Sequence, residues 1–300
     1  VDWVLGHGAL LLGHGRPEII EALRRHAAEG LLLPGPTPLE EEVKEQLLAC
    51  YPHHEDLAFG KNGSDVCTAA VRLARAVTGR EGVLHHGYHG FHDGFVAADP
   101  GVPGIPAGLR RLIYAIPYGD LENLRGILAG HGAGIAALLM EPFREELPPP
   151  GYLEAVRRLC REQGVVLIFD EIVTGFRVGP GGAQALHGVR ADLTCLGKAM
   201  AGGMPLSALL GPAEWIGRLG ELRYGMTARA EQLSLAAAAA ALPLLREAAD
   251  AAAAGAGKAL RERFAEACSR QGSGARLLGH PAMMRLSLPA GEGGPAAAVR

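Results

Sequence analysis

The sequence predicts an α/β fold in which helices cover both faces of a mainly parallel sheet. Seven short apolar runs recur along the chain, and helical patterns separate most of them. Because these runs are apolar on both faces, they are typical of strands buried between two layers of helices. The seven runs are residues 57–60, 83–85, 112–116, 135–140, 165–169, 193–196 and 207–210.

Composition indicates one large domain with a smaller one. The 300 residues are 48% hydrophobic and include 43 glycines, which excludes a disordered chain. The longest uncharged stretch, from Gln232 to Leu245, is interrupted by Pro243 and is too short for a membrane span. The formal net charge is −3 and basic residues are interleaved with acidic ones, so we expect neither nucleic acid nor a membrane as a partner.

Five cysteines are widely spaced and form no C-x-x-C pair. This pattern predicts reduced thiols in a cytoplasmic protein, with neither a disulfide framework nor a Cys-based zinc site. The chain begins at Val1 without a charged and then apolar leader. We therefore expect no signal peptide and a natural start further upstream.

The segments on either side of the seven runs are predicted to be mostly helical. Pro17 opens a helix over about 18–28, prolines at 34, 36 and 38 form an extended connector, and an acidic helix spans 39–50. Beyond Glu231 the chain is Ala-rich and helical, and the tail from 272 to 300 holds one strand-like run, 283–288, before a Gly, Pro and Ala stretch.

We divide the chain into three parts. Residues 1–38 are expected to be an N-terminal segment of a small domain, and 39–245 the large domain. Residues 246–300 are expected to be the C-terminal part of the small domain, which is incomplete here.

Turns with polar residues follow the predicted strands at 60–64, 86–90, 141–142, 170–171 and 197–198. In open α/β sheets a ligand binds beyond the carboxyl ends of the strands. The turns are therefore expected to meet in one site.

Lys198 is one of only four lysines and follows the predicted strand 193–196, before a Gly-rich turn. A lysine that is desolvated there would have a lowered pKa and could form a Schiff base. On spacing alone, a solvated surface lysine explains the residue equally well.

Asp170 closes the fully apolar run 165–169. A buried carboxylate is costly unless a cation accompanies it. The protonated pyridine nitrogen of pyridoxal phosphate is such a cation. The alternative is a salt bridge to an arginine such as Arg177.

Gly63 and Ser64 begin a predicted helix over 65–78, with Ser64 as a good N-cap. The free N–H groups and the dipole of a helix start bind anions. Simple capping explains Ser64 alone. A phosphate is favoured because Lys198 and Asp170 together call for a pyridine ring with a phosphate tail.

Four histidines and Asp93 form the only cluster that suggests a metal site. Glycines at 87 and 90 interrupt any helix and the H-E-x-x-H pattern is absent, so no metal is expected. Tyr88 is available as an aromatic plate against a flat ring. Phosphate-loop, nucleophile-elbow and dinucleotide fingerprints are also missing. The histidines are His85, His86, His89 and His92.

Eight motifs appear in order between about residues 2 and 245. They are 59–65 (FGKNGSD), 70–80 (AVRLARAVTGR), 87–90 (GYHG), 140–142 (MEP), 169–177 (FDEIVTGFR), 181–184 (GGAQ), 192–198 (DLTCLGK) and 202–205 (GGMP). Together they closely resemble the class III pyridoxal-phosphate-dependent aminotransferases, and most of all the glutamate-1-semialdehyde 2,1-aminomutase branch.

The resemblance implies fold type I, with a mainly parallel seven-stranded sheet and a smaller α+β domain. It also implies pyridoxal 5'-phosphate as cofactor, a small-molecule amino substrate, and a homodimer with shared sites. Lys198 resembles the Schiff-base lysine, and Asp170 the partner of the pyridine nitrogen. The other implied cofactor-binding residues are Ile172 and Tyr88 on the two ring faces, His89, Gly63 and Ser64 at the phosphate, and Thr227 reaching the neighbouring subunit's phosphate.

The branch is inferred mainly from Val173, where many ω-aminotransferases carry Gln. Three segments depart from the aminomutase pattern, namely 143–146, Gly119 and 228–230. Amino-group transfer within one substrate is the leading hypothesis. An ω-aminotransferase, an amino-acid racemase and a non-catalytic cofactor-binding or dimer-forming remnant stay open as alternatives.

Overall fold

The computed structural model describes residues 2, 4–33, 35–144, 146–248 and 252–289. Val1, Pro34 of the expected connector and the Gly, Pro and Ala tail beyond residue 289 lie outside the described residues.

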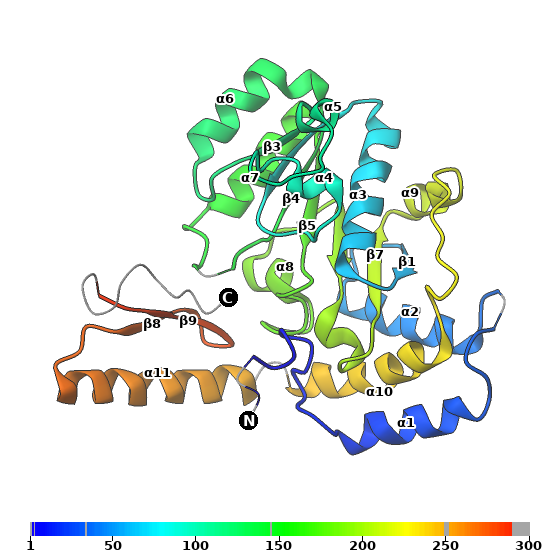
Figure 1. Ribbon diagram of the computed structural model, residues 1–300, viewed down its shortest axis with the longest axis vertical. Coiled ribbons are helices and arrows are strands. Elements are labelled where there is room, and N and C mark those ends of the chain that lie inside the picture. The colour runs from blue at the N-terminus through cyan, green and yellow to red at the C-terminus, as the bar shows by residue number, and fades with distance from the viewer. Residues whose placement is uncertain (1, 3, 34, 145, 249–251, 290–300) are drawn as a thin grey trace.

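A seven-stranded sheet forms the centre of the molecule, with the strand order β1-β7-β6-β5-β4-β2-β3 (Figure 1). Strands β2 to β6 run parallel to one another, whereas β7 is antiparallel to both of its neighbours. The expected mainly parallel sheet is therefore confirmed. The strands are β1 (Asp56–Gly60), β2 (Gly82–His86), β3 (Ile113–Ala115), β4 (Ile135–Met140), β5 (Val166–Asp170), β6 (Leu193–Leu196) and β7 (Ser207–Gly211).

Helices cover the sheet on both faces. The longer ones are α1 (Pro17–Ala27), α2 (Pro38–Cys50), α3 (Gly63–Thr78), α6 (Leu121–His131), α7 (Tyr152–Gln163), α10 (Gln232–Ala248) and α11 (Ala252–Gln271). Shorter ones are α4 (Asp93–Val96), α5 (Ala107–Arg110), α8 (Gly182–His187), α9 (Ala213–Gly217) and the 3₁₀ turns η1 (Gly132–Gly134), η2 (Lys198–Ala201) and η3 (Arg218–Gly220).

Successive side chains along a strand point to opposite faces of the sheet, so the core is divided into layers on the two faces. In β4, Ala137 and Leu139 pack in the cluster with α3, while Leu138 and Met140 pack with α6 and α7 on the opposite face. A third cluster joins α1, α2 and α10 to the other end of the sheet, on the face opposite α3. Every residue of β4 is buried, as expected for a strand between two helical layers.

The C-terminal part contains α11 and an antiparallel pair of strands, β8 (Arg276–His280) and β9 (Met283–Ser287). Arg261 on α11 donates to the carbonyl of Gly279 at 2.5 Å, which fixes the helix against the hairpin. Figure 1 shows this unit beside the N-terminal segment. The expectation of a single strand in this tail is wrong, because β9 pairs with a second strand over 276–280.

Two further details differ from expectation. Helix α10 continues through Pro243 to Ala248, because burial of Leu242 and Leu245 in the core outweighs the hydrogen bond that proline cannot make. The N-cap of α3 is Asn62 rather than Ser64, which lies within the first turn. Among the helices in the described ranges, none has the length and apolar character needed to cross a membrane.

Candidate active site

The site lies where β1, β2, β4, β5 and β6 end. Because these strands run in one direction, the residues that follow them meet along one edge of the sheet. This edge brings together the α3 start, Glu141, Asp170 and Lys198. The expected convergence of strand-end turns is therefore present.

Lys198 begins η2 directly after Gly197 and has a left-handed backbone, with φ +46. Such a conformation is strained for a residue with a side chain and persists only where its surroundings hold it. The side chain is half-buried. Burial lowers the pKa of Lys198, whereas the charges of Asp170 and Glu141 raise it and those of Arg144 and Arg177 lower it further, with burial the largest effect.

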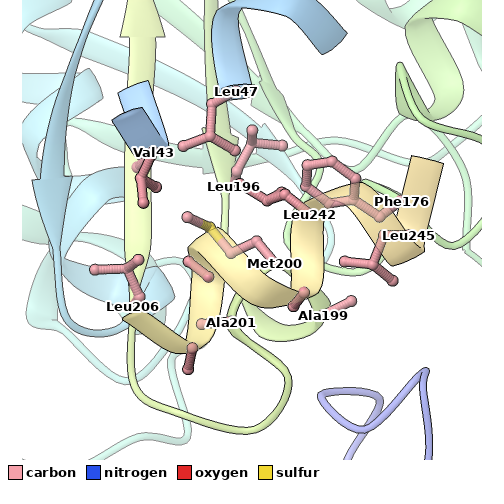
Figure 2. Close-up of a cluster of buried hydrophobic side chains, with 14 of the residues drawn as sticks. Val43, Leu47, Phe176, Leu196, Ala199, Met200, Ala201, Leu206, Leu242 and Leu245 are labelled. Atoms are coloured by element: carbon pink, nitrogen blue, oxygen red, sulfur yellow. The ribbon is translucent and has the colours of Figure 1, made fainter. Parts of the chain in front are cut away.

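The core beneath η2 holds this strained lysine in place. Ala199, Met200 and Ala201, which follow Lys198, are all buried against α2 and α10. Figure 2 shows Met200 in one apolar cluster with Leu47, Leu196 and Leu242. The turn that presents Lys198 is thus anchored by apolar packing rather than left as a free loop.

Asp170 ends β5 and is 3% exposed. Its Oδ2 accepts from His89 Nδ1 at 2.7 Å and from Cys67 Sγ at 3.6 Å, and its Oδ1 accepts from the Ile172 backbone at 3.0 Å. The His89 Nε2 faces the carbonyl of His86 at 3.1 Å, so the ring is held on both sides. The side chain that pairs with Asp170 is therefore His89 and not Arg177.

The start of α3 is a helix N-terminus at the same edge of the sheet. The Asp65 carboxylate accepts from the backbone of Asn62 at 2.7 Å and of Lys61 at 3.2 Å, which fixes the loop. A Cβ on Gly63 would lie 2.5 Å from Ile172 Cδ1, so a larger residue there would require the Ile172 side chain to move. Ser64 Oγ similarly occupies the space that a Cβ on residue 90 would need.

Glu141 and Tyr88 line the site from β4 and the turn after β2. The Tyr88 backbone donates to Glu141 Oε2 at 3.3 Å, and a Cβ on Gly87 would overlap the same carboxylate. Burial raises the pKa of Glu141, and the charge of Asp170 raises it further. The Tyr88 ring is 63% exposed in a single chain.

Lys61 lies against the start of α10, and Thr227 precedes that helix in the chain. Lys61 Nζ contacts Glu231 at 2.8 Å and Ser234 at 3.2 Å, at the start of α10. Thr227 is exposed and lines a cavity of about 370 Å³. The exposed Leu32 and Leu33 line the same cavity.

The histidine cluster of the sequence separates in the fold. His86 faces the Ile116 carbonyl and His92 contacts the Thr68 hydroxyl, so neither joins His89 at Asp170. In the described residues a different trio, Cys67, His89 and Asp170, offers ligand atoms within 4.8 Å of one another. This trio is already occupied by its own hydrogen bonds.

Sequence reasoning missed three features of the site. It assigned no role to Glu141 and did not foresee that His89 pairs with Asp170. It also kept a salt bridge between Asp170 and Arg177 as an alternative, whereas the guanidinium donates to the carbonyls of Gly8 at 3.0 Å and Ala282 at 3.2 Å. The position of Glu141 directly after a buried strand could have indicated its place in the site.

A lysine and a carboxylate at the carboxyl edge of such a sheet define an α/β protein of the transaminase fold. A solved structure described as a transaminase with PLP bound superposes with a TM-score of 0.88 at 29% identity, covering 94% of this chain and 71% of that one. A glutamate-1-semialdehyde aminomutase from Pseudomonas aeruginosa PAO1 gives a TM-score of 0.84 at 25% identity, covering 95% and 69%.

The chain belongs to the aminotransferase class-III family, whose profile matches residues 1–275. A curated relative, the glutamate-1-semialdehyde 2,1-aminomutase of Roseiflexus castenholzii, is 39% identical over 264 residues. The match covers 82% of this chain and 61% of the relative, so the chain spans less than two thirds of that relative's length.

Proposed function

We propose that the protein binds pyridoxal 5'-phosphate and transfers the amino group of a small-molecule substrate. The observation that carries this proposal is the pair Lys198 and Asp170 at one edge of the sheet. Burial lowers the pKa of the Lys198 amine, which favours the neutral, nucleophilic form. The buried Asp170 carboxylate offers a negative charge to a cationic ring nitrogen.

The residues at this edge fit such a group. A carboxylate accepts about four hydrogen bonds, and three acceptor contacts of Asp170 are used within the chain. The α3 start supplies backbone N–H groups for a phosphate. When bound, the group withdraws electrons from the substrate carbon that bears the amine. The residues that would hold it are Lys198, Asp170, Gly63, Ser64, Tyr88, His89, Ile172 and the Thr227 of a second chain.

Each of these residues has a definable task. Asp170, fixed by His89, would hold a proton on the ring nitrogen. Lys198 Nζ would take the proton from the substrate carbon that bears the amine and deliver it to the cofactor. Ile172, which lies against Gly63 and Gly197, would keep water from one face of the ring.

The first test locates the lysine. Borohydride reduction of the cofactor-loaded protein should leave a phosphopyridoxyl group on the peptide that contains Lys198. Lys198→Ala should lose turnover and this label, with the fold unchanged by circular dichroism. A label on Lys61, the other lysine near the α3 start, would refute the assignment.

We propose further that the transfer is intramolecular, as in a glutamate-1-semialdehyde 2,1-aminomutase. The 39% identity to such an enzyme supports this choice. Glutamate 1-semialdehyde should then be isomerised without any added amino acceptor, moving the amino group from carbon 2 to carbon 1. Transfer between two substrates is the second candidate, favoured by the likeness to a transaminase. A strict requirement for an added keto acid would establish that second candidate instead.

We also propose a homodimer in which Thr227 serves the partner's site. Thr227 and the exposed apolar side chains of Leu32 and Leu33 line one cavity, and a second chain could cover that surface. Mixing inactive Lys198→Ala chains with inactive Thr227→Ala chains tests this. If sites are shared, one site of each heterodimer carries both lesions and the other carries none, so activity returns. If Thr227 serves its own chain, nothing is recovered.

A cytoplasmic location is proposed from the cysteines, all five of which are free thiols. Cell fractionation with an antibody against the chain would test it. Recovery in an oxidising, extracellular fraction would contradict the proposal.

A further inference from the structure

Three buried side chains of different chemistry meet at Asp170. The Cys67 thiol on α3, the His89 ring after β2 and the Asp170 carboxylate at the end of β5 have ligand atoms within 4.8 Å of one another. Asp170 is the most exposed of the three side chains, at 3%. A thiolate, an imidazole and a carboxylate are the ligand types that bind zinc in proteins. The trio therefore has the chemistry of a metal site.

The distances within the trio are close to those of a tetrahedral zinc site. Zinc lies about 2.3 Å from sulfur and about 2.0–2.2 Å from nitrogen or oxygen, which separates sulfur from oxygen by roughly 3.6 Å and nitrogen from oxygen by roughly 3.4 Å. Cys67 Sγ is already 3.6 Å from Asp170 Oδ2. His89 Nδ1 is 2.7 Å from the same oxygen, so the two atoms would move apart by about 0.7 Å.

Neighbouring backbone groups orient two of the ligands. A metal-binding histidine usually donates its second ring N–H to a carbonyl or carboxylate, which aims the other nitrogen at the metal. His89 Nε2 faces the carbonyl of His86 at 3.1 Å, so Nδ1 is the nitrogen that points to Asp170. The Ile172 backbone fixes Asp170 Oδ1 at 3.0 Å and leaves Oδ2 towards the other two ligands.

A second thiol lies beside the first. Cys195 pairs with Asp170 between β6 and β5, and its thiol shares a hydrogen bond with that of Cys67. Both cysteines are fully buried. Soft sulfur ligands favour zinc, whereas magnesium and calcium are bound by oxygen. The cluster is therefore selective for a zinc-like cation, and Cys195 is available as a fourth ligand.

We propose that Cys67, His89 and Asp170 bind a zinc ion, and that this ion and pyridoxal phosphate exclude each other. On binding, Cys67 and His89 Nδ1 release to water any proton that they carry, and the hydrogen bonds within the trio are replaced by bonds to the metal. The zinc site rests on the ligand geometry alone. The exclusion rests on the proposed function, because the ion and a cationic ring nitrogen would both need the Asp170 carboxylate.

Titration of the cofactor-free protein with Co²⁺ tests the site, because Co²⁺ accepts the ligands of zinc and absorbs light through its bonds to thiolates. A cobalt–thiolate absorption band should appear, and Zn²⁺ should remove it. Cys67→Ala and His89→Gln should each weaken the binding of both metals at least about 10-fold. Cys160→Ala is the matched control, since Cys160 is an equally buried thiol in the cluster on the opposite face of the sheet, and its effect should stay within about twofold.

A second experiment adds pyridoxal phosphate to the zinc-loaded protein after gel filtration has removed free zinc. The visible absorption band of the bound cofactor should appear only after a chelator has taken the zinc away. Cofactor binding with the zinc retained would overturn the exclusion.

The variants decide whether the site exists. Absence of the cobalt–thiolate band, or a band that both Cys67→Ala and His89→Gln leave unchanged, would overturn the zinc site. Circular dichroism establishes that each variant is folded, and either variant alone is sufficient for the comparison. A chain that binds cobalt through Cys67 but never binds pyridoxal phosphate would refute the proposed function and support the zinc site.

Discussion

Replacing Glu171 by methionine should destabilise the protein strongly without touching Lys198. Glu171 is fully buried and its carboxylate accepts from Thr174 Oγ1 at 2.7 Å and from the Ala183 backbone at 2.6 Å. It also accepts from the backbone of Gln184 at 3.1 Å and from its side-chain amide at 3.2 Å. A Cβ on Gly182 would overlap the same carboxylate, so the backbone packs closely around it.

The size of the effect follows from these four donors. Methionine has a similar length and leaves no room for water, but it accepts no strong hydrogen bond. The Thr174 hydroxyl can rotate, and the Gln184 amide keeps its hydrogen bonds to Thr194 at 2.9 Å and to the Ala191 backbone at 2.8 Å, whereas the two backbone N–H groups cannot turn. Two unsatisfied buried donors at about 1–3 kcal/mol each give a loss of about 2–6 kcal/mol. This is a large share of the roughly 5–15 kcal/mol that stabilises a typical domain.

Urea unfolding followed by circular dichroism measures this loss. Glu171→Gln keeps one acceptor oxygen and should lose less. The exposed Glu45 on α2 provides a control, and Glu45→Ala should change the free energy of unfolding by less than about 0.5 kcal/mol. A loss below about 1 kcal/mol in Glu171→Met would refute the reasoning that these N–H groups depend on the carboxylate.

Three other perturbations have defined outcomes. Asp170→Asn should slow the reaction with an amino substrate by several orders of magnitude in single-turnover absorbance measurements, because a neutral amide cannot hold a ring nitrogen protonated; near-normal rates would make Asp170 a purely structural group. In the cofactor-free protein, reductive methylation should modify Lys198 at lower pH than Lys44, as detected by mass spectrometry. The reason is that burial lowers the pKa of Lys198, whereas the hydrogen bond to Asp56 raises the pKa of Lys44. The opposite order would contradict the burial argument. Burial lowers the pKa of His85 from 6.5 to about 4, so the unfolded chain takes up a proton that the folded chain does not. Stability should fall as pH drops from about 6.5 towards 4, and His85→Leu should reduce that slope in urea titrations at each pH.

The sheet was predictable because its strands are apolar on both faces. The runs at 135–140 and 193–196 coincide with β4 and β6, and the others differ from their strands by one residue at one or both ends. The hairpin strand β8 escaped prediction for a physical reason. It begins with Arg276 and ends with His280, and its residues are exposed or half-buried, so it lacks the apolar character of the other strands.

The only site residues that the sequence could predict are those that lie at the carboxyl ends of strands. Lys198 and Asp170 were placed together by that rule. The contact of His89 with Asp170 joins residues 81 positions apart, and that of Arg177 with Gly8 joins residues 169 positions apart. No local sequence pattern predicts such contacts, because they depend on the conformations that the loops adopt in the folded protein. The domain boundaries and the individual roles of the cofactor-binding residues stay predictions.

The pairing of β1 with β7 limits how early during synthesis the sheet can be completed. β1 lies at the edge of the sheet and its one neighbour is β7, with Asp56 opposite Gly211. During translation β1 therefore cannot pair until β7 has been synthesised, about 150 residues or roughly 8–30 s later at ribosomal speed. Until then β1 presents an unpaired strand edge to the cell, and the nascent chain needs protection for longer than its size alone would suggest.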